Sequence, residues 1–253
     1  SRANVKFFKH NDMEDLKRVL TQVAQSDRSL GRELNAQRRF LVVEALYKNT
    51  GNVCPLDKLI ELKHEFKYRL ILDESFSFGS LGETGRGATE LFKKKLMYDA
   101  EIVVVSVENS LGSIGALTIG TEEVVDHQRL SGSGYCFSAA SPPFTASAAI
   151  AALNLLETRS DVTLKRLNAN REYLYKNLKT LLHEKLEDLL LITSDERSPI
   201  VLLQVADIPE TEYLDEVVFL EEVARESLAR GVAFVATGAA TDLPPGIRLT
   251  VSA

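Results

Sequence analysis

One stretch of this sequence has the form of a catalytic loop. Residues 103–120 read VVVSVENSLGSIGALTIG, an apolar run followed by small residues and glycines. This pattern is typical of a buried strand that leads into a tight loop with exposed backbone, where enzymes often place a reactive side chain. The residue at that point is Asn109, and a carboxamide is not a nucleophile. The stretch therefore predicts a platform for chemistry that lacks the reactive group.

Asp73 is the second candidate, because it ends the apolar strand pattern RLILD. A carboxylate at a buried strand end needs a hydrogen-bonded or cationic partner. A protonated heterocyclic nitrogen of a ligand would meet that need. Asp73 can also serve as the cap of a neighbouring turn, and the spacing alone leaves both interpretations open.

The elements that position these residues alternate between strand and helix patterns. Asp12 is a plausible N-cap for a helix with apolar positions at 13, 16, 19, 20 and 23. Strands are expected over residues 38–46, 69–73 and 101–107, and helices over 56–68 and after the Gly-rich loop that follows the second strand. This order predicts an α/β fold with a mostly parallel sheet and helices on both faces. In such sheets ligands bind at the carboxyl ends of the strands. Asp73 ends the second expected strand, and Asn109 comes shortly after the third.

The pattern changes from about residue 142. Two long helices, broken near Ser160 and Asp161, are expected before strands at 189–194 and 198–205. A helix from about Tyr213 to Arg230, closed by Gly231, and strands at 232–237 and 246–251 follow. We therefore expect residues 1–155 to be part of a large domain whose N-terminal portion is missing. Residues 156–253 are expected to form a small C-terminal α+β domain whose end is truncated.

Composition narrows the classes of function. The 253 residues carry a net charge of −6, which argues against nucleic acid as the main partner. Cys54 and Cys136 have no metal or redox spacing, and His10 and His127 are isolated in the sequence, so no metal site is predicted. The apolar segment at residues 144–156 is too short to span a bilayer.

Four motifs occur in order over about the first 145 residues: FKHNDMEDL, RRFLVVEALYKNTGNVCPL, ILDESFSFGSLGETGRG and HQRLSGSGYCFSAASPP. Together they resemble the pyridoxal-phosphate-dependent α-oxoamine synthases, which condense an amino acid with an acyl-CoA and release CO2. The resemblance implies the fold-type I, aminotransferase-like fold and pyridoxal 5'-phosphate as the cofactor.

Two departures from the family pattern concern the reactive groups. In catalytic members the loop reads roughly Thr-Lys-Ser-Phe-Gly, and its lysine binds the cofactor covalently, whereas Asn109 stands at the lysine position here. The pattern Asp-Glu-Ala-His-Ser-x-Gly appears with Phe76 at the histidine position. The comparison therefore implies no catalytic residue in this chain and leaves Asp73 as a cofactor-binding candidate.

The resemblance is strongest to the non-lysine subunit of heterodimeric family members. It implies a partner subunit that carries the lysine and the cofactor and joins L-serine to palmitoyl-CoA, giving 3-ketodihydrosphingosine for sphingolipid synthesis. It further implies that the full-length parent lies at the endoplasmic reticulum membrane, on the cytosolic face, held by a segment outside this sequence. Small activating and regulatory membrane subunits are further expected partners.

Ser138 is the remaining cofactor-binding candidate. It lies in GYCFSAASPP, which we interpret as an aromatic strand stopped by a double proline. The family comparison implies that its hydroxyl reaches the cofactor phosphate in the partner's site; the alternative is an ordinary strand-end hydroxyl. Gly85, Arg86 and Gly87 are either a loop near a dimer interface or a surface turn.

Two other functions stay open on the sequence alone. The first is a homodimeric α-oxoamine synthase that uses another lysine, and Lys48 is the only lysine near a strand exit. The second is a scaffold or regulatory pseudoenzyme that contacts no active site.

Overall fold

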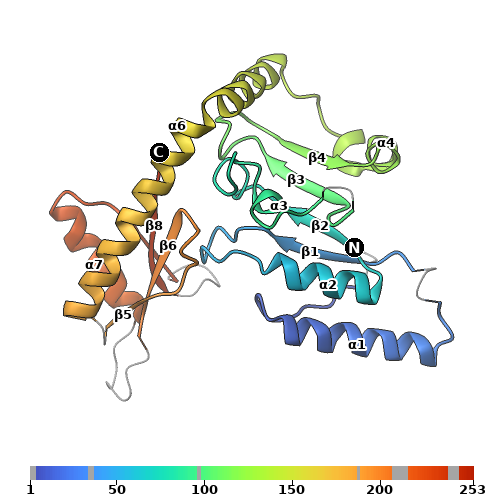
Figure 1. Ribbon diagram of the computed structural model, residues 1–253, viewed down its shortest axis with the longest axis horizontal. Helices are drawn as coiled ribbons and strands as arrows, with labels where there is room; N and C mark the ends of the chain where they lie inside the picture. Colours follow the sequence, from blue (N-terminus) through green and yellow to red (C-terminus); the bar gives the residue numbers. More distant parts are fainter. Residues whose placement is uncertain (1–3, 34–36, 96–97, 187–188, 207–215, 239–244) are drawn as a thin grey trace.

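The computed structural model describes residues 4–33, 37–95, 98–186, 189–206, 216–238 and 245–253. Within these residues the chain forms two four-stranded sheets, connected by a long helix that runs diagonally through the molecule (Figure 1). The first sheet has the order β1-β2-β3-β4, and the second has the order β5-β6-β8-β7.

The first sheet is mixed and mostly parallel, as expected. Strands β1 (Phe40–Glu44), β2 (Arg69–Asp73) and β3 (Ile102–Ser106) run parallel, and β4 (Ala116–Gly120) pairs antiparallel with β3. The register places Glu44 opposite Asp73. The carboxyl ends of the three parallel strands therefore meet at one edge of the sheet, which confirms the predicted α/β fold with a mostly parallel sheet, while helices on both faces of it stay a prediction.

Helices α1 (Met13–Ser29) and α2 (Leu56–Phe66) cover one face of this sheet. Asp12 caps α1 as predicted, because its side chain accepts the N–H of Asp15 at 2.9 Å. Alternate strand residues point into the core with these helices: Leu41, Val43, Leu70, Leu72, Val103 and Val105. On the opposite face Val42 is 66% exposed. The period of two in burial is what a strand with one packed face requires.

Three short helices follow the strands: α3 (Ala88–Leu91) after β2, and α4 (Glu122–Ser131) and α5 (Ser133–Cys136) after β4. The aromatic strand expected around Ser138 is wrong, because residues 133–136 are helical and Ser138 lies in the bend that follows. The N–H groups of Cys136 and Phe137 bond to carbonyls four residues earlier, at 2.8 and 3.0 Å. The backbone here makes local helical hydrogen bonds, whereas a strand would need hydrogen bonds to a neighbouring strand.

The long helix α6 (Pro143–Leu181) connects the two sheets and continues into a π-helical turn, Leu182–Leu186. The break expected near Ser160 and Asp161 is observed as a kink inside this helix. Arg159 alone leaves the helical region, with φ −130° and ψ 16°, and the helix resumes after it. The two expected helices are therefore one kinked helix that spans the expected domain boundary at residue 155.

The second sheet consists of antiparallel strands β5 (Leu190–Ile192), β6 (Ile200–Val205), β7 (Val235–Thr237) and β8 (Gly246–Thr250). It packs against α7 (Glu216–Ala229) and the second half of α6 through a core that includes Tyr175, Val201, Leu220 and Ile247. The predicted start of the α7 helix at Tyr213 lies outside the described residues. The residues that follow the first sheet therefore form an α+β arrangement. The division into two domains near residue 155 stays a prediction.

Candidate functional site

The strand exits of the first sheet bring Asp73 and Asn109 together around Ser75. The N–H of Ser75 donates to Asp73 Oδ1 at 2.8 Å, and the Ser75 carbonyl accepts the side-chain Nδ2 of Asn109 at 2.8 Å. The Ser75 hydroxyl oxygen accepts the N–H of Ser106, the last residue of β3, at 3.0 Å. Ser75 was not among the predicted site residues, although a serine two residues after an aspartate at a strand end is a signal for a side-chain-capped turn.

Asp73 has its hydrogen-bonded partner within the chain. It is half-buried at the end of β2, and one carboxylate oxygen caps the turn at Ser75. Of the two interpretations of this residue, the turn cap is present in the structure. Its role towards a cofactor stays a prediction.

Glu74, which the sequence did not single out, is a buried structural acid. Its carboxylate accepts the N–H groups of Ala88 and Thr89 at 2.8 and 2.9 Å, together with the hydroxyl of Ser77. Burial raises the pKa of Glu74, while these hydrogen bonds oppose the rise. Gly87 is required beside it, because a Cβ there would lie 2.1 Å from Glu74 Oε2. Glu74 therefore holds the start of α3 against the end of β2.

The Gly85–Gly87 turn also has a structural role. Its backbone N–H at Arg86 donates to Glu90 Oε2 at 3.1 Å. A Cβ at Gly85 would approach Leu164 of α6 at 3.2 Å, so the turn packs directly on the long helix. These contacts support the interpretation as a turn, and a place at a dimer interface stays a prediction.

Phe76 packs between the two sheets. Its half-buried ring lies against a cluster formed by Leu46, Val53, Leu81 and Ile200, the last of which begins β6. Lys48, in the loop after β1, places its Nζ 5.4 Å from the centroid of the Phe76 ring. The apolar ring at the family's histidine position therefore serves as a packing residue and has a cation over its face.

Glu44 is the acidic neighbour of Asp73 at this edge. Burial raises the pKa of the Glu44 carboxyl, and the charge of Asp73 adds to the rise, while the backbone of Lys48 opposes it. The edge therefore holds two carboxylates in adjacent strands, one of which is partly desolvated.

Ser138 lies apart from the polar cluster around Ser75. It is exposed in the bend after α5, and the hydrogen bonds described for Ser75 do not include it. The structure thus brings together Asp73 and Asn109 and leaves Ser138 on the surface. A role of Ser138 in the site of another subunit stays a prediction.

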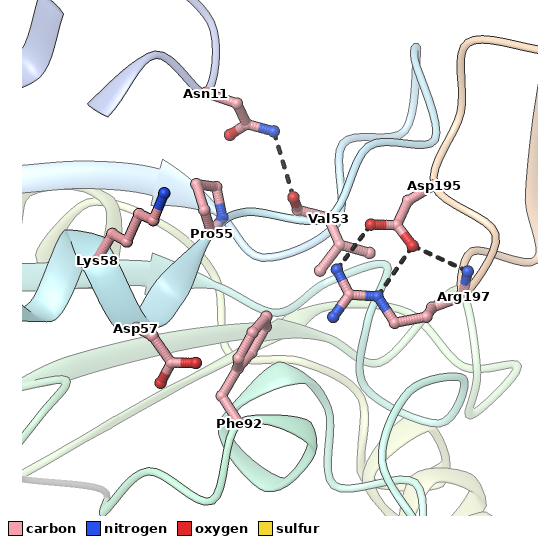
Figure 2. A pocket seen from close by; sticks show the side chains of 8 residues that line it. All are labelled: Asn11, Val53, Pro55, Asp57, Lys58, Phe92, Asp195 and Arg197. Carbon is pink, nitrogen blue, oxygen red and sulfur yellow. Dashed lines mark hydrogen bonds and ion pairs between the residues drawn. The ribbon is translucent and has the colours of Figure 1, made fainter. Parts of the chain in front are cut away.

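A pocket of about 430 Å³ lies where loops of the two halves meet (Figure 2). Val53, Pro55 and Phe92 give it an apolar side, and the guanidinium of Arg197 lies 5.3 Å from the Phe92 ring centroid. Arg197 binds Asp195 through Nε and Nη2 at 2.9 and 2.7 Å. Burial opposes ionisation of Asp195, but these bonds outweigh it and lower the pKa of that carboxyl. Asp73, Phe76, Asn109 and Ser138 do not line this pocket.

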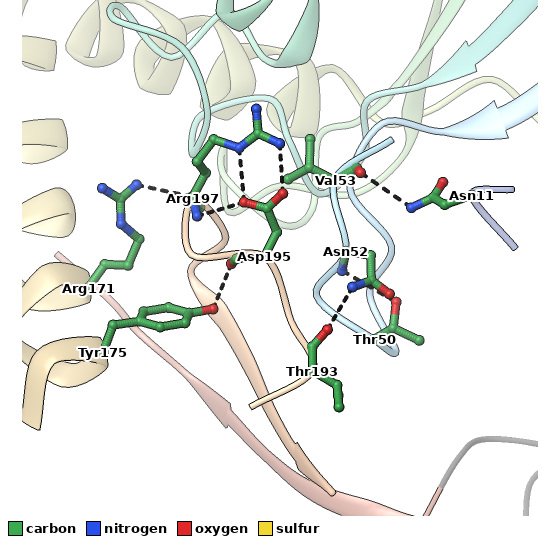
Figure 3. A network of polar contacts seen from close by, with 9 residues as sticks. All are labelled: Asn11, Thr50, Asn52, Val53, Arg171, Tyr175, Thr193, Asp195 and Arg197. Atoms are coloured by element: carbon green, nitrogen blue, oxygen red, sulfur yellow. Dashed lines mark hydrogen bonds and ion pairs between the residues drawn. The ribbon is translucent and has the colours of Figure 1, made fainter. Parts of the chain in front are cut away.

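A polar network beside the pocket fastens the second sheet to the loop after β1 (Figure 3). Asn52 donates to the carbonyl of Thr193 at 2.9 Å, and the N–H of Asp195 donates to the carbonyl of Gly51 at 3.1 Å. The hydroxyl of Tyr175 in α6 donates to the Asp195 carbonyl at 2.6 Å. The sequence patterns do not predict this junction, because its contacts between the two sheets, from Asn52 to Thr193 and from Gly51 to Asp195, join residues more than a hundred positions apart.

The model of the aminotransferase class I and II family matches residues 1–253. The chain therefore belongs to this family.

The curated relatives are more specific. Long chain base biosynthesis protein 1c of Oryza sativa subsp. japonica is 39% identical over 260 residues, covering 100% of this chain and 51% of the relative. Long chain base biosynthesis protein 1 of Arabidopsis thaliana is 36% identical, again over 100% of the chain and 51% of the relative. Serine palmitoyltransferase 1 of Saccharomyces cerevisiae is 33% identical over 81% of the chain and 36% of the relative. The chain spans about half the length of the plant relatives that it matches.

Solved structures agree on the fold. The serine palmitoyltransferase of Sphingomonas wittichii superposes with a TM-score of 0.71 at 22% identity, covering 97% of this chain and 55% of that one. The 8-amino-7-oxononanoate synthase of Francisella tularensis gives 0.75 at 22% identity, covering 99% and 64%. Among the described residues, none of the helices has the length and apolar character needed to cross a membrane.

Proposed function

We propose that this chain is the core of the non-lysine subunit of a heterodimeric serine palmitoyltransferase. The observation that carries the proposal is Asn109, which lies on the loop after β3 at the family's lysine position, in a chain similar to long chain base biosynthesis proteins. The subunit supports the decarboxylative condensation of L-serine with palmitoyl-CoA to 3-ketodihydrosphingosine. We place the full-length parent at the endoplasmic reticulum membrane, with its large and small domains divided near residue 155.

The residues of this chain do not fit covalent attachment of pyridoxal phosphate. When bound, this cofactor supplies an electron sink for bond breaking at the amino acid α-carbon. Asn109 offers a carboxamide in place of an amine, and its Nδ2 already donates to the Ser75 carbonyl. Phe76 offers an apolar ring that packs in the cluster between the sheets. We therefore assign the covalent cofactor to the partner subunit and a supporting role to this chain.

The proposal is tested with the full-length parent and the lysine-bearing long-chain-base subunit, purified separately and together. We expect product only from the assembled pair. A partner that is stable and fully active alone, with kinetics unchanged by this chain, would reject the proposal in favour of the scaffold interpretation.

A homodimeric enzyme that uses another lysine makes a different prediction. Lys48 is the lysine closest to the strand exits in sequence, but its Nζ lies over the Phe76 ring. Borohydride reduction of the purified chain with pyridoxal phosphate, followed by peptide mapping, should find no stoichiometrically modified lysine. A single fully modified lysine would favour the homodimeric enzyme.

Ser138→Ala tests the composite site. If Ser138 donates to the cofactor phosphate bound in the partner, the lost hydrogen bond to an anion is worth roughly 1.5–3 kcal/mol. Pyridoxal phosphate retention by the heterodimer should then weaken by about one to two orders of magnitude. The exposed Ser133→Ala is the matched control. Unchanged cofactor affinity in an assembled heterodimer would return Ser138 to a structural role.

A further inference from the structure

The loop after β3 is exposed and yet internally bonded. Glu108, Asn109, Ser110 and Gly112 all lie on the surface. The N–H of Gly112 donates to the Glu108 carbonyl at 3.2 Å, and the N–H of Ser113 donates to the Val107 carbonyl at 3.0 Å. The N–H of Glu108 donates to the Ser106 hydroxyl at 3.1 Å. These bonds hold the loop in one shape but do not attach it to the neighbouring strand exit.

The side chain of Asn109 makes that attachment. Its Nδ2 donates to the Ser75 carbonyl, in the turn after β2, across 34 positions of sequence. Ser75 is held in turn by Asp73 through its N–H and by Ser106 through its hydroxyl. All three polar groups of Ser75 are therefore occupied, and the donor that occupies its carbonyl comes from the residue at the lysine position.

A second, independent observation shows how closely the two segments pack. Gly79 has φ +79°, and a Cβ there would lie 2.3 Å from the Cβ of Ser110. The turn after β2 and the loop after β3 therefore touch at both ends of the contact, through Asn109 and Ser75 and through Ser110 and Gly79. The absence of a side chain at position 79 is what permits this approach.

We infer that Asn109 is a positioning residue: its carboxamide ties the loop at residues 107–113 to the turn at residues 73–79. The strand exits form a hydrogen-bonded unit in which the residue at the lysine position has a structural partner, Ser75. The carboxamide suits this role, because its donor lies close to the backbone and is fixed in a plane. A lysine carries its donors at the end of a flexible four-carbon chain. To reach the same carbonyl, that chain would have to bend back on itself and lose its conformational freedom.

Hydrogen exchange of the loop amides tests the attachment. Asn109→Asp keeps the shape of the side chain but replaces the donor with an acceptor, so a carboxylate faces the Ser75 carbonyl. We expect the amides of Gly112 and Ser113 to exchange about twofold to tenfold faster, as the loss of one hydrogen bond implies. Asn154→Asp, the same substitution at an exposed position of α6, is the matched control and should leave the exchange rates of these amides unchanged. Asn109→Ala removes the donor without adding charge and should behave as Asn109→Asp does.

Unchanged exchange in both Asn109 variants would overturn the inference. The cofactor provides a second arm, which rests on the proposed function. Asn109→Lys should also speed exchange of the loop and should retain no more pyridoxal phosphate after gel filtration than the natural chain. Stoichiometric cofactor trapped at the substituted position would show that the site is open and overturn the inference, while the proposed function would stand. Cofactor trapped on a lysine of the natural chain would reject the proposed function instead.

Discussion

Lys63 shows at the scale of one residue how this chain uses charge inside its core. The side chain is only 2% exposed, and its Nζ donates to the carbonyls of Tyr98 and Asp99 at 2.7 and 3.0 Å. It also pairs with Glu101 Oε1 at 2.6 Å. Glu101 uses its other oxygen to accept the N–H of Leu70 in β2. Lys63 therefore ties α2 to the turn that leads into β3.

Replacing this ammonium with an apolar side chain of similar length should be costly. Lys63→Met leaves two backbone carbonyls and the Glu101 carboxylate without their donor, and breaking a buried pair in this way costs about 3–5 kcal/mol. Urea denaturation should show that loss in the free energy of unfolding. Lys58→Met, at an exposed position of the same helix, is the control and should change it by less than about 0.5 kcal/mol. Equal effects of the two substitutions would contradict the role of Lys63.

Glu74 predicts a pH dependence. Burial raises the pKa of its carboxyl in the folded chain above the ordinary value of 4.5. The folded state therefore holds this proton over a pH range in which the unfolded chain has released it. The resulting stabilisation is fully present below the unfolded pKa and is lost as the pH rises through the folded pKa.

Glu74→Gln removes this titration, so the free energy of unfolding of the variant should lack that decline above about pH 4.5. The variant should also be less stable at neutral pH, because one of its side-chain NH2 hydrogens faces the N–H of Ala88 or Thr89. Denaturant titrations at a series of pH values measure both effects. Parallel curves for the two proteins would show that Glu74 does not titrate with folding.

At this scale the sequence identified the positions of chemistry better than their contacts. The motifs alone indicate that residues 109 and 76 stand at the family's lysine and histidine positions and carry neither an amine nor an imidazole. The bond from Asn109 to Ser75 does not, because it depends on how two loops from neighbouring strands approach each other. The capping role of Glu74 likewise depends on a helix fourteen positions later in the chain.

Among the elements, helix α3 ends in a way that its sequence does not favour. Lys93 has φ +52°, in the left-handed region where glycine is usual. Its N–H donates to the Glu90 carbonyl at 2.9 Å, and the N–H of Lys94 donates to the Thr89 carbonyl at 2.7 Å, which is the Schellman pattern. The helix end is therefore well bonded but carries a side chain at its strained position.

Lys93→Gly should raise the free energy of unfolding by about 1 kcal/mol, because it relieves that strain while keeping both backbone bonds. Lys93→Ala keeps the Cβ and should give no such gain. Thermal denaturation of the three proteins compares them directly. A destabilised glycine variant would mean that the lysine side chain contributes more than its backbone strain costs.

The same scale shows which elements sequence patterns predict. The strand at Arg69–Asp73 and the helix capped by Asp12 were predicted correctly, because apolar periodicity and a capping residue are local signals. The turn of helix at Ser133–Cys136 was mistaken for a strand, because its aromatic residues favour strands and only the lack of a pairing partner decides against one. The kink at Arg159 was expected as a break, since Ser160 and Asp161 have the types of an N-cap.

At the scale of the whole molecule, the sheets are connected by the kinked helix α6, by the junction of loops beside the pocket, and by the apolar cluster around Phe76 (Figures 1 and 3). Gly51 is central to the second. Its carbonyl accepts the N–H of Asp195, and a Cβ on it would lie 2.3 Å from the Ile200 carbonyl oxygen and 2.8 Å from the Ser194 Cβ. The loop after β1 thus lies directly on the backbone that enters β6.

Gly51→Ala should push the loop after β1 away from the backbone that enters β6. The substitution places a Cβ in the left-handed region at φ +68°, which costs about 1–2 kcal/mol, and adds an overlap with the β6 backbone that costs about 1–3 kcal/mol more. Gly31→Ala is a matched control, because Gly31 has φ +64° and no heavy atom within 4 Å of the added Cβ. The control therefore carries the backbone strain without the overlap.

Hydrogen exchange at the amides of Asp195 and Ser198 reports on the junction itself. These amides should be deprotected by Gly51→Ala and unaffected by Gly31→Ala, while the free energy of unfolding falls further for the first variant than for the second. If both variants lose the same stability and neither exposes the junction, the close approach of the loop to β6 does not hold the two sheets together. Helix α6 and the cluster around Phe76 would then be the contacts described above that hold the sheets together.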